Sequence, residues 1–230
     1  LMQVAKDENV LVLEDCAGAL GSRYGDKSVG RFGDAAAFSF NGNKVLTTSG
    51  GGALYVRDPE MREATRSWAN QGKAINALGY QHDTIGYNYK LSNICAAIGL
   101  AQLKTVDQRL NRKAAIFRHY ASAFADVDGI EMMPCPAHGQ GNFWLSSIRL
   151  KSQEKAEMMV SKLRENGIEA SPMWKPMQMQ RLNRDLRTFG GDVSRNIYIQ
   201  SLSLPSGSSL TDSELDRICE IVREQLRVAS

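Results

Sequence analysis

Residues 35–52 read AAAFSFNGNKVLTTSGGG, and this stretch decides the predicted fold. Small apolar residues at 35–40 predict one strand, and the residues at 51–56 predict the next. The Asn and Gly residues between them predict a tight turn at 41–49, which carries Lys44. A lysine in a turn is usually a surface charge. A lysine kept from water between two buried strands is instead a usable nucleophile toward carbonyl compounds, because desolvation disfavours the charged ammonium.

A third strand is predicted upstream of this stretch. Residues 10–13 read VLVL, and a continuous apolar run of this length fits a strand buried on both faces of a parallel α/β sheet. Asp15 follows at the carboxyl end of the run. Ligands bind beyond the carboxyl ends of strands in open α/β sheets, so Asp15 is a candidate binding residue. An acid there also fits a helix cap or a turn, and both interpretations stay open.

The rest of the chain alternates predicted helices, strands and loops without an internal repeat. The Gly-rich residues 24–33 predict a loop or short hairpin, and residues 71–89 predict an extended functional loop. Strands are predicted at 143–150 and 168–171, and helices at 60–69, 94–106, 107–125, 154–166 and 192–200. Thr211 and Glu214 have capping-box spacing and predict the start of a last helix. This order predicts an α/β fold with two domains, residues 1–106 and residues 107–230.

Composition excludes several classes of function. The 230 residues are 43% hydrophobic and 23% charged, which is typical of globular proteins. The net charge of +3 comes without a basic block, so we expect no nucleic-acid partner. Because no apolar run approaches about 18 residues, we expect no membrane partner. Four scattered cysteines and three scattered histidines predict reduced thiols, a cytoplasmic location and no metal site.

Three side chains in sequence order suit one cofactor. Asp15 ends one predicted strand, Ser39 ends the next, and Lys44 follows five residues later. Pyridoxal 5'-phosphate (PLP) needs an acid beside its pyridine nitrogen, hydroxyl and N–H donors for its phosphate, and an amine for its aldehyde. The spacing of Ser39 and Lys44 alone is weak evidence. The order of all three residues, alternating with strands, is a much stronger indication.

The chain resembles the DegT/DnrJ/EryC1/StrS family of PLP-dependent sugar aminotransferases, which have fold type I. The resemblance covers essentially the whole chain in the family's order. It rests on LEDCA at 13–17, GRFGD at 30–34, FSFNGNK at 38–44, TTSGGG at 47–52, GYNYKLSN at 86–93, WKPM at 174–177 and LPS at 204–206. The NGNK and TTSGGG forms are most similar to the branch that aminates C4 of UDP-linked 4-keto-6-deoxy-N-acetylhexosamines, on the route to bacillosamine-type sugars.

The resemblance implies a role for four residues of the first domain. Lys44 matches the Schiff-base lysine and the catalytic residue of the family. Asp15 matches the acid that pairs with the pyridinium nitrogen, and Ser39 matches a phosphate-binding hydroxyl. Asn88 matches an asparagine that reaches the phosphate of the neighbouring subunit's cofactor. The implied assembly is therefore a homodimer whose active site is shared between subunits.

The implied reaction adds an amino group to C4 of the nucleotide-linked keto sugar, with L-glutamate as the donor. Trp174 and Lys175 lie in a segment that approaches substrate in the family, although packing and a surface charge explain them equally well. Residues 1–106 then correspond to the remainder of the large PLP-binding domain, and residues 107–230 to the small carboxyl-terminal α+β domain.

Three positions depart from the family's pattern, and they keep other functions open. Gly18 stands where a polar residue usually lies near the cofactor ring. Ser171 replaces an arginine of the related branch, and Gln178 replaces a histidine. The last two bear on which sugar is used. The alternatives are a non-catalytic paralogue and another fold type I enzyme such as a lyase.

The first residues suggest that the chain is partial. It begins Leu1-Met2-Gln3 and enters a strand almost at once. The resemblance implies that a preceding part would supply the phosphate-binding turn and the residue stacked on the pyridoxal ring. We therefore expect this chain to lack a complete site and to be inactive alone.

Overall fold

The computed structural model describes residues 1–74 and 78–228. They form two compact units, and each is described here by itself. The first contains Leu1–Leu110 and Pro136–Asn142, and the second contains Asn111–Cys135 and Phe143–Ser230. The domain division at residue 106 stays a prediction, because compact packing does not establish that either part folds alone.

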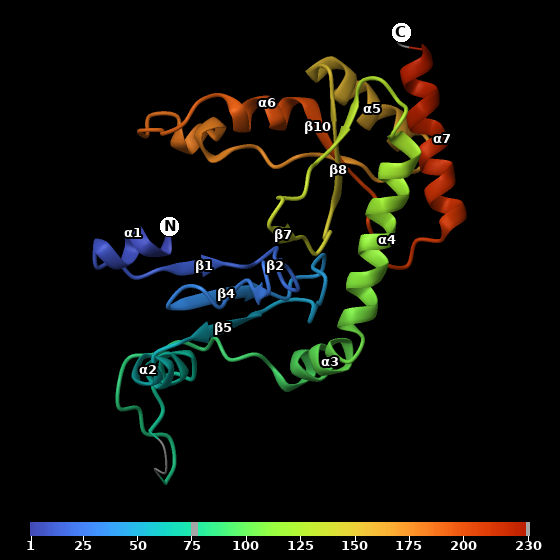
Figure 1. The fold of residues 1–230 in the computed structure, drawn as a ribbon. Coiled ribbons are helices and arrows are strands. Elements are labelled where there is room, and N and C mark those ends of the chain that lie inside the picture. Colours follow the sequence, from blue (N-terminus) through green and yellow to red (C-terminus); the bar gives the residue numbers. More distant parts are fainter. Residues whose placement is uncertain (75–77, 229–230) are drawn as a thin grey trace. The chain divides into compact units, whose positions relative to one another are not determined.

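A three-stranded sheet organises the first unit (Figure 1). Its strands are β1 (Leu13–Asp15), β4 (Ala35–Ser39) and β5 (Gly52–Val56), in the order β1-β4-β5. β1 runs parallel to β4, and β4 runs antiparallel to β5. The two strands predicted on either side of the Lys44 turn are thus confirmed, and they are neighbours in the sheet. The predicted burial of the second strand is wrong, because β5 is exposed at every position before Val56.

The predicted burial of the upstream strand is wrong. The strand starts at Leu13 rather than at residue 10, after the helix α1 (Met2–Asp7). The side chains of Leu11 and Leu13 are 80% and 65% exposed. Among the described residues β1 is an edge strand paired with β4 alone, so its apolar side chains lack the covering layers that a central parallel strand has.

A small second sheet confirms the predicted hairpin. β2 (Arg23–Tyr24) and β3 (Lys27–Ser28) pair with each other, and β2 also pairs with β7 (Gly139–Gln140). Asn142 donates from its side-chain amide to the carbonyl oxygens of Gly18 and Leu20, each at 2.9 Å. These contacts attach residues 136–142 to the first unit.

Two helices of the first unit begin at side-chain caps. Asp58 accepts the N–H of Met61 at 2.7 Å and caps α2 (Pro59–Ala69). Ser92 accepts the N–H of Cys95 at 3.3 Å and caps α3 (Asn93–Leu103), which ends three residues earlier than predicted. Of the loop predicted at 71–89, residues 75–77 lie outside the described residues.

The second unit is α+β. Its antiparallel sheet has the order β6-β8-β10-β9, with the strands Ile130–Met132, Ser146–Leu150, Ser201–Leu204 and Ser171–Pro172. Its helices are α4 (Val106–Phe124, from residue 111 onward), α5 (Gln153–Glu165), α6 (Val193–Gln200) and α7 (Asp212–Val228), with two 3₁₀ turns at Met177–Met179 and Arg181–Asn183. β6, β10 and the two 3₁₀ turns were not predicted, and the remaining strands and helices lie near their predicted positions.

Helices and sheet of the second unit bury one hydrophobic core. Its fully buried members include Ile116 and Tyr120 of α4, Ile148 of β8, Leu202 of β10 and Val222 of α7. Such a core is the main stabilising contribution to a unit of this size, because each large apolar side chain removed from water contributes ~1.5–3 kcal/mol.

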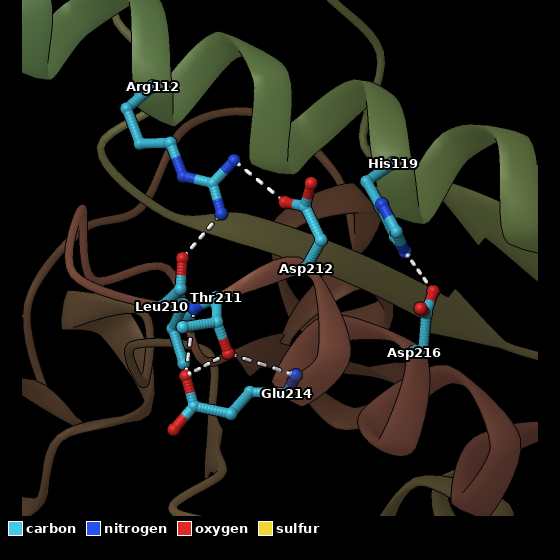
Figure 2. Close-up of polar contacts among 7 residues, drawn as sticks. All are labelled: Arg112, His119, Leu210, Thr211, Asp212, Glu214 and Asp216. Atoms are coloured by element: carbon cyan, nitrogen blue, oxygen red, sulfur yellow. Dashed lines mark hydrogen bonds and ion pairs between the residues drawn. The ribbon is translucent and has the colours of Figure 1, made fainter.

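Polar contacts join α4 to α7 at the edge of this core (Figure 2). Arg112 pairs with Asp212 at 2.9 Å, and Nε2 of His119 lies 2.9 Å from Asp216. The N–H of Glu214 is donated to Oγ1 of Thr211 at 3.3 Å, and its carboxylate accepts the N–H of Thr211 at 2.8 Å. The predicted capping box is therefore confirmed.

Candidate functional site

Asp15 and Ser39 lie at the same edge of the first sheet. Asp15 is directly opposite Ala37 in the parallel pair of β1 and β4, and the N–H of Cys16 is donated to the carbonyl of Ala37 at 2.9 Å. Ser39 follows Ala37 by two residues and so points to the same face. The carboxylate of Asp15 and the hydroxyl of Ser39 thus lie at the carboxyl ends of neighbouring strands, on the same face of the sheet.

Both side chains also make local hydrogen bonds. Oδ1 of Asp15 accepts the N–H of Ala17 at 3.0 Å, and Oγ of Ser39 accepts the N–H of Asn41 at 3.3 Å. These contacts fix the turns that leave each strand. A turn-forming role and a ligand-binding role for Asp15 are compatible, since a carboxylate has two oxygens and about four lone-pair positions.

Lys44 lies in a turn whose backbone is closed at both ends. The N–H of Lys44 is donated to the carbonyl of Asn41 at 3.0 Å, and the N–H of Thr48 is donated to the carbonyl of Phe40 at 2.9 Å. Lys44 is half-buried, and Val45 after it is buried. The turn therefore keeps the backbone of Lys44 within a few residues of the end of β4.

The residues after Lys44 pack against α3. The sequence predicted this helix but not its contact with the Lys44 turn. The N–H of Thr47 is donated to Oε1 of Gln102 at 3.1 Å. Thr48 is buried, and a Cβ added at Gly99 of α3 would lie 2.7 Å from its Cγ2. The absence of a side chain at Gly99 thus lets the helix approach the loop that carries Lys44.

Glu14 anchors the GRFGD segment beside the site, and the sequence did not predict this role. Its carboxylate accepts the N–H groups of Gly30 at 2.8 Å, Phe32 at 2.7 Å and Gly33 at 2.6 Å. Partial burial, the largest influence, acts to raise the pKa of Glu14, but the N–H groups of Gly33, Gly30 and Phe32 together lower it. From the other side, Arg57 donates to the carbonyl of Gly33 at 2.9 Å.

Asn88 lies in the segment that follows α2. It is exposed and forms an isolated antiparallel bridge with Asn70 at the end of α2. The rings of Tyr87 and Tyr89 on either side of it stack with centroids 5.2 Å apart. Its predicted reach to a neighbouring subunit stays a prediction.

Trp174 and Lys175 belong to the second unit, whereas Lys44 belongs to the first. Trp174 is 63% exposed, and its ring packs on the ring of Trp144 with centroids 5.4 Å apart. Lys175 is exposed and lines an open pocket of about 520 Å³ together with Arg181, amide side chains and apolar side chains. Both residues are therefore accessible to a ligand, and their substrate role stays a prediction.

The donor set at the sheet edge fits PLP. A carboxylate suits the pyridine nitrogen, a hydroxyl suits the phosphate and an amine suits the aldehyde, and Asp15, Ser39 and Lys44 supply one of each. Within residues 1–74 and 78–228, no group of three or more His, Cys, Asp or Glu side chains is arranged to hold a metal ion. Across the same ranges, no helix is both long enough and apolar enough to span a bilayer.

A family model and several known proteins match nearly the whole of this chain. The model of the DegT/DnrJ/EryC1/StrS aminotransferase family matches residues 1–223. The chain is 40% identical over 217 residues to EpsN of Bacillus subtilis, covering 93% of this chain and 56% of EpsN. It is 34% identical to GDP-perosamine synthase of Escherichia coli O157:H7, covering 97% of this chain and 60% of that enzyme.

The fold agrees with a solved structure of the same kind. Helicobacter pylori PseC, an aminotransferase involved in the biosynthesis of pseudoaminic acid, superposes with a TM-score of 0.91 at 25% identity. The superposition covers 99% of this chain and 62% of PseC, so the chain spans less than two thirds of these relatives. The expected fold is thereby confirmed, and the chain belongs to the DegT/DnrJ/EryC1/StrS aminotransferase family.

Proposed function

We propose that this chain carries the lysine-bearing part of a PLP-dependent aminotransferase that acts on a nucleotide-linked keto sugar. One observation carries the proposal. Lys44 sits in a closed turn directly after β4, at the edge where Asp15 and Ser39 share a face. The family match supports the same chemistry over residues 1–223.

Each residue has a defined task in this proposal. Bound PLP supplies an electron sink and carries the amino group between donor and acceptor. The carboxylate of Asp15 would hold a proton on the pyridine nitrogen, and the hydroxyl of Ser39 would donate to the phosphate. Nζ of Lys44 would bind the cofactor aldehyde and move the proton at the carbon that receives the amino group.

The proposed acceptor position is C4 of a 4-keto-6-deoxy sugar, and the proposed amino donor is L-glutamate. The NGNK and TTSGGG forms favour a UDP-linked N-acetylhexosamine as acceptor. The 34% identity to GDP-perosamine synthase favours a GDP-linked sugar as the second candidate. The two differ in the nucleotide and in the N-acetyl group, which a direct comparison of substrates separates.

We also propose a cytoplasmic homodimer in which Asn88 reaches the partner's cofactor phosphate. The helix α3 supports association, because it is rich in apolar residues and exposes Ile94, Ile98, Leu100 and Leu103. A helix that is apolar on all sides is normally covered by protein. All four cysteines are free thiols, which agrees with a reducing compartment.

The test uses the full-length protein with PLP and ¹⁵N-labelled glutamate. We expect the label to enter a UDP-linked or a GDP-linked 4-keto-6-deoxy sugar, as detected by mass spectrometry. Sulfide release from cysteine without labelling of either sugar would instead identify a lyase. Failure of the protein to bind PLP would identify a non-catalytic paralogue.

A further inference from the structure

The second unit contains a buried lysine that has no task in the proposed chemistry. Lys113 of α4 is 7% exposed. Its Nζ donates to the carbonyl oxygen of Trp144 at 3.0 Å and to that of Ser206 at 2.8 Å. A buried ammonium is costly unless it is hydrogen-bonded, and an aliphatic side chain would fill the space without that cost. The two carbonyl groups therefore explain a lysine here better than packing does.

The two carbonyl groups lie at the same end of a strand pair. The ladder of β8 and β10 ends where Ser146 is opposite Leu204. Trp144 precedes this end by two residues and Ser206 follows it by two. Beyond the ladder, Oγ of Ser206 accepts the N–H of Ser146 at 2.8 Å and donates to the carbonyl of Leu204 at 2.9 Å. Two residues beyond the ladder on each strand, the ammonium of Lys113 bridges the carbonyl groups of Trp144 and Ser206.

A second side chain of α4 reaches the same segment. Tyr120 lies seven residues after Lys113, on the same face of the helix. Its hydroxyl donates to the carbonyl of Pro205 at 2.9 Å. The carbonyl groups of Pro205 and Ser206 are thus hydrogen-bonded by side chains of α4, which fixes the LPS segment to this helix.

Trp144 connects this anchor to the proposed substrate segment. Its ring packs on Trp174 with centroids 5.4 Å apart and planes tilted by 31°. The backbone before Trp174 is fixed by β9, where Pro172 pairs with Leu202. The exposed ring of Trp174 therefore packs against the ring of Trp144. The backbone carbonyl of Trp144 is in turn held by the ammonium of Lys113.

We infer that Lys113 is a positioning residue for nucleotide-sugar binding. It holds the backbone of Trp144, which sets the Trp144 ring and, through it, the ring of Trp174. The inference rests on the proposed function and on the prediction that Trp174 and Lys175 approach the substrate. Lys113 itself is buried and acts through Trp144.

The kinetic test replaces Lys113 in the full-length protein. Lys113→Met keeps a long side chain but removes the donors, so both carbonyl groups lose a partner. We expect KM for the nucleotide sugar to rise ~10-fold, which corresponds to ~1.4 kcal/mol of binding free energy lost when the ring of Trp174 is misplaced. The half-reaction with the amino donor should stay within about twofold, because uniform loss of sugar binding does not affect it. Lys113→Arg should restore part of the affinity, and the exposed Lys104→Met is the matched control.

A spectroscopic test needs neither cofactor nor substrate. Residues 1–230 contain three tryptophans, so in this part of the protein Trp68→Phe leaves Trp144 and Trp174, and spectra are compared as differences from the Trp68→Phe protein. We expect Lys113→Met to reduce the near-ultraviolet circular dichroism of this pair, and Lys104→Met to leave it unchanged. If the wild-type protein labels no sugar, the proposed function fails, and the spectrum still decides whether Lys113 positions the pair.

Three results would overturn the inference. The first is an unchanged spectrum and an unchanged KM in folded Lys113→Met. The second is an equal loss in both half-reactions, which would indicate a general packing defect. The third comes from Trp144→Phe, which leaves Lys113 intact and also serves if Lys113→Met does not fold. This variant should raise KM for the nucleotide sugar, and an unchanged KM would remove the link to Trp174.

Discussion

The carboxylate of Glu14 accepts the backbone N–H of Gly33 at 2.6 Å, and this contact ties β1 to the segment that leads into β4. Because Gly30 and Phe32 donate to the same carboxylate, one side chain fixes the connection between the strands that present Asp15 and Ser39. The relative positions of Asp15 and Ser39 therefore depend on Glu14, which has no role in binding the proposed cofactor.

Glu14→Gln should destabilise the protein by ~1–3 kcal/mol at pH 7, because it replaces a charged acceptor of three N–H groups by a neutral amide. The lowered pKa of Glu14 stabilises the fold above the unfolded value of 4.5, and this contribution is lost as the pH falls through the folded value. Because Glu14→Gln has no carboxylate to protonate at this position, its free energy of unfolding should fall less than that of the wild-type protein as the pH drops below 4.5. Urea unfolding at pH 7 and pH 4 measures both effects, with Glu8→Gln as the exposed control.

The glycines of the TTSGGG stretch should differ in their tolerance of a methyl group. A Cβ at Gly52, opposite Ser39, would overlap the carbonyl oxygen of Phe38, whereas one at Gly50 would meet nothing within 4 Å. We expect Gly52→Ala to cost ~1–3 kcal/mol by overpacking and Gly50→Ala to be nearly neutral. Urea unfolding of both variants measures this difference in the free energy of unfolding. Equal losses would mean that the backbone at Ser39 is not constrained by this close approach.

The capping box of α7 gives a prediction for the second unit (Figure 2). Thr211→Ala removes the acceptor of the N–H of Glu214 and should cost about 0.5–2 kcal/mol. Ser213→Ala makes a similar chemical change in the first turn and should have a smaller effect. Thermal unfolding of both variants measures the difference, and a larger loss in Ser213→Ala would contradict the assignment of the cap.

The apolar surface of α3 predicts how the protein associates. Leu100 is 63% exposed, and a charge there should prevent its burial in a homodimer. We expect full-length Leu100→Glu to sediment as a monomer and Lys104→Glu to remain dimeric. A dimeric Leu100→Glu protein would show that α3 is not part of the subunit interface.

Local signals predicted the Lys44 turn, because strands, turn residues and the small residues beside them are neighbours in sequence. Glu14 escaped prediction because its partners lie 16 to 19 residues away and are backbone groups that leave no pattern. The strand β10 alternates Ser and Leu but is buried at every position, which a half-exposed pattern does not indicate. Gly139 and Gln140 pair with β2 across more than a hundred residues, so the place of residues 136–142 in the first unit could not be predicted from local sequence.

The central claim is that Lys44 binds the cofactor aldehyde. Identifying the lysine that carries the bound cofactor tests this claim directly. Full-length wild-type, Lys44→Ala and Lys104→Ala proteins are incubated with PLP and freed of excess cofactor, and their visible absorbance is recorded before reduction. Each protein is then treated with borohydride and analysed by peptide mass spectrometry. We predict that the wild-type and Lys104→Ala proteins keep the visible absorbance of bound PLP and carry a reduced pyridoxyl group on Lys44. The Lys44→Ala protein should show neither. A pyridoxyl group on another lysine of the wild-type protein, or an unchanged spectrum in Lys44→Ala, would contradict the claim.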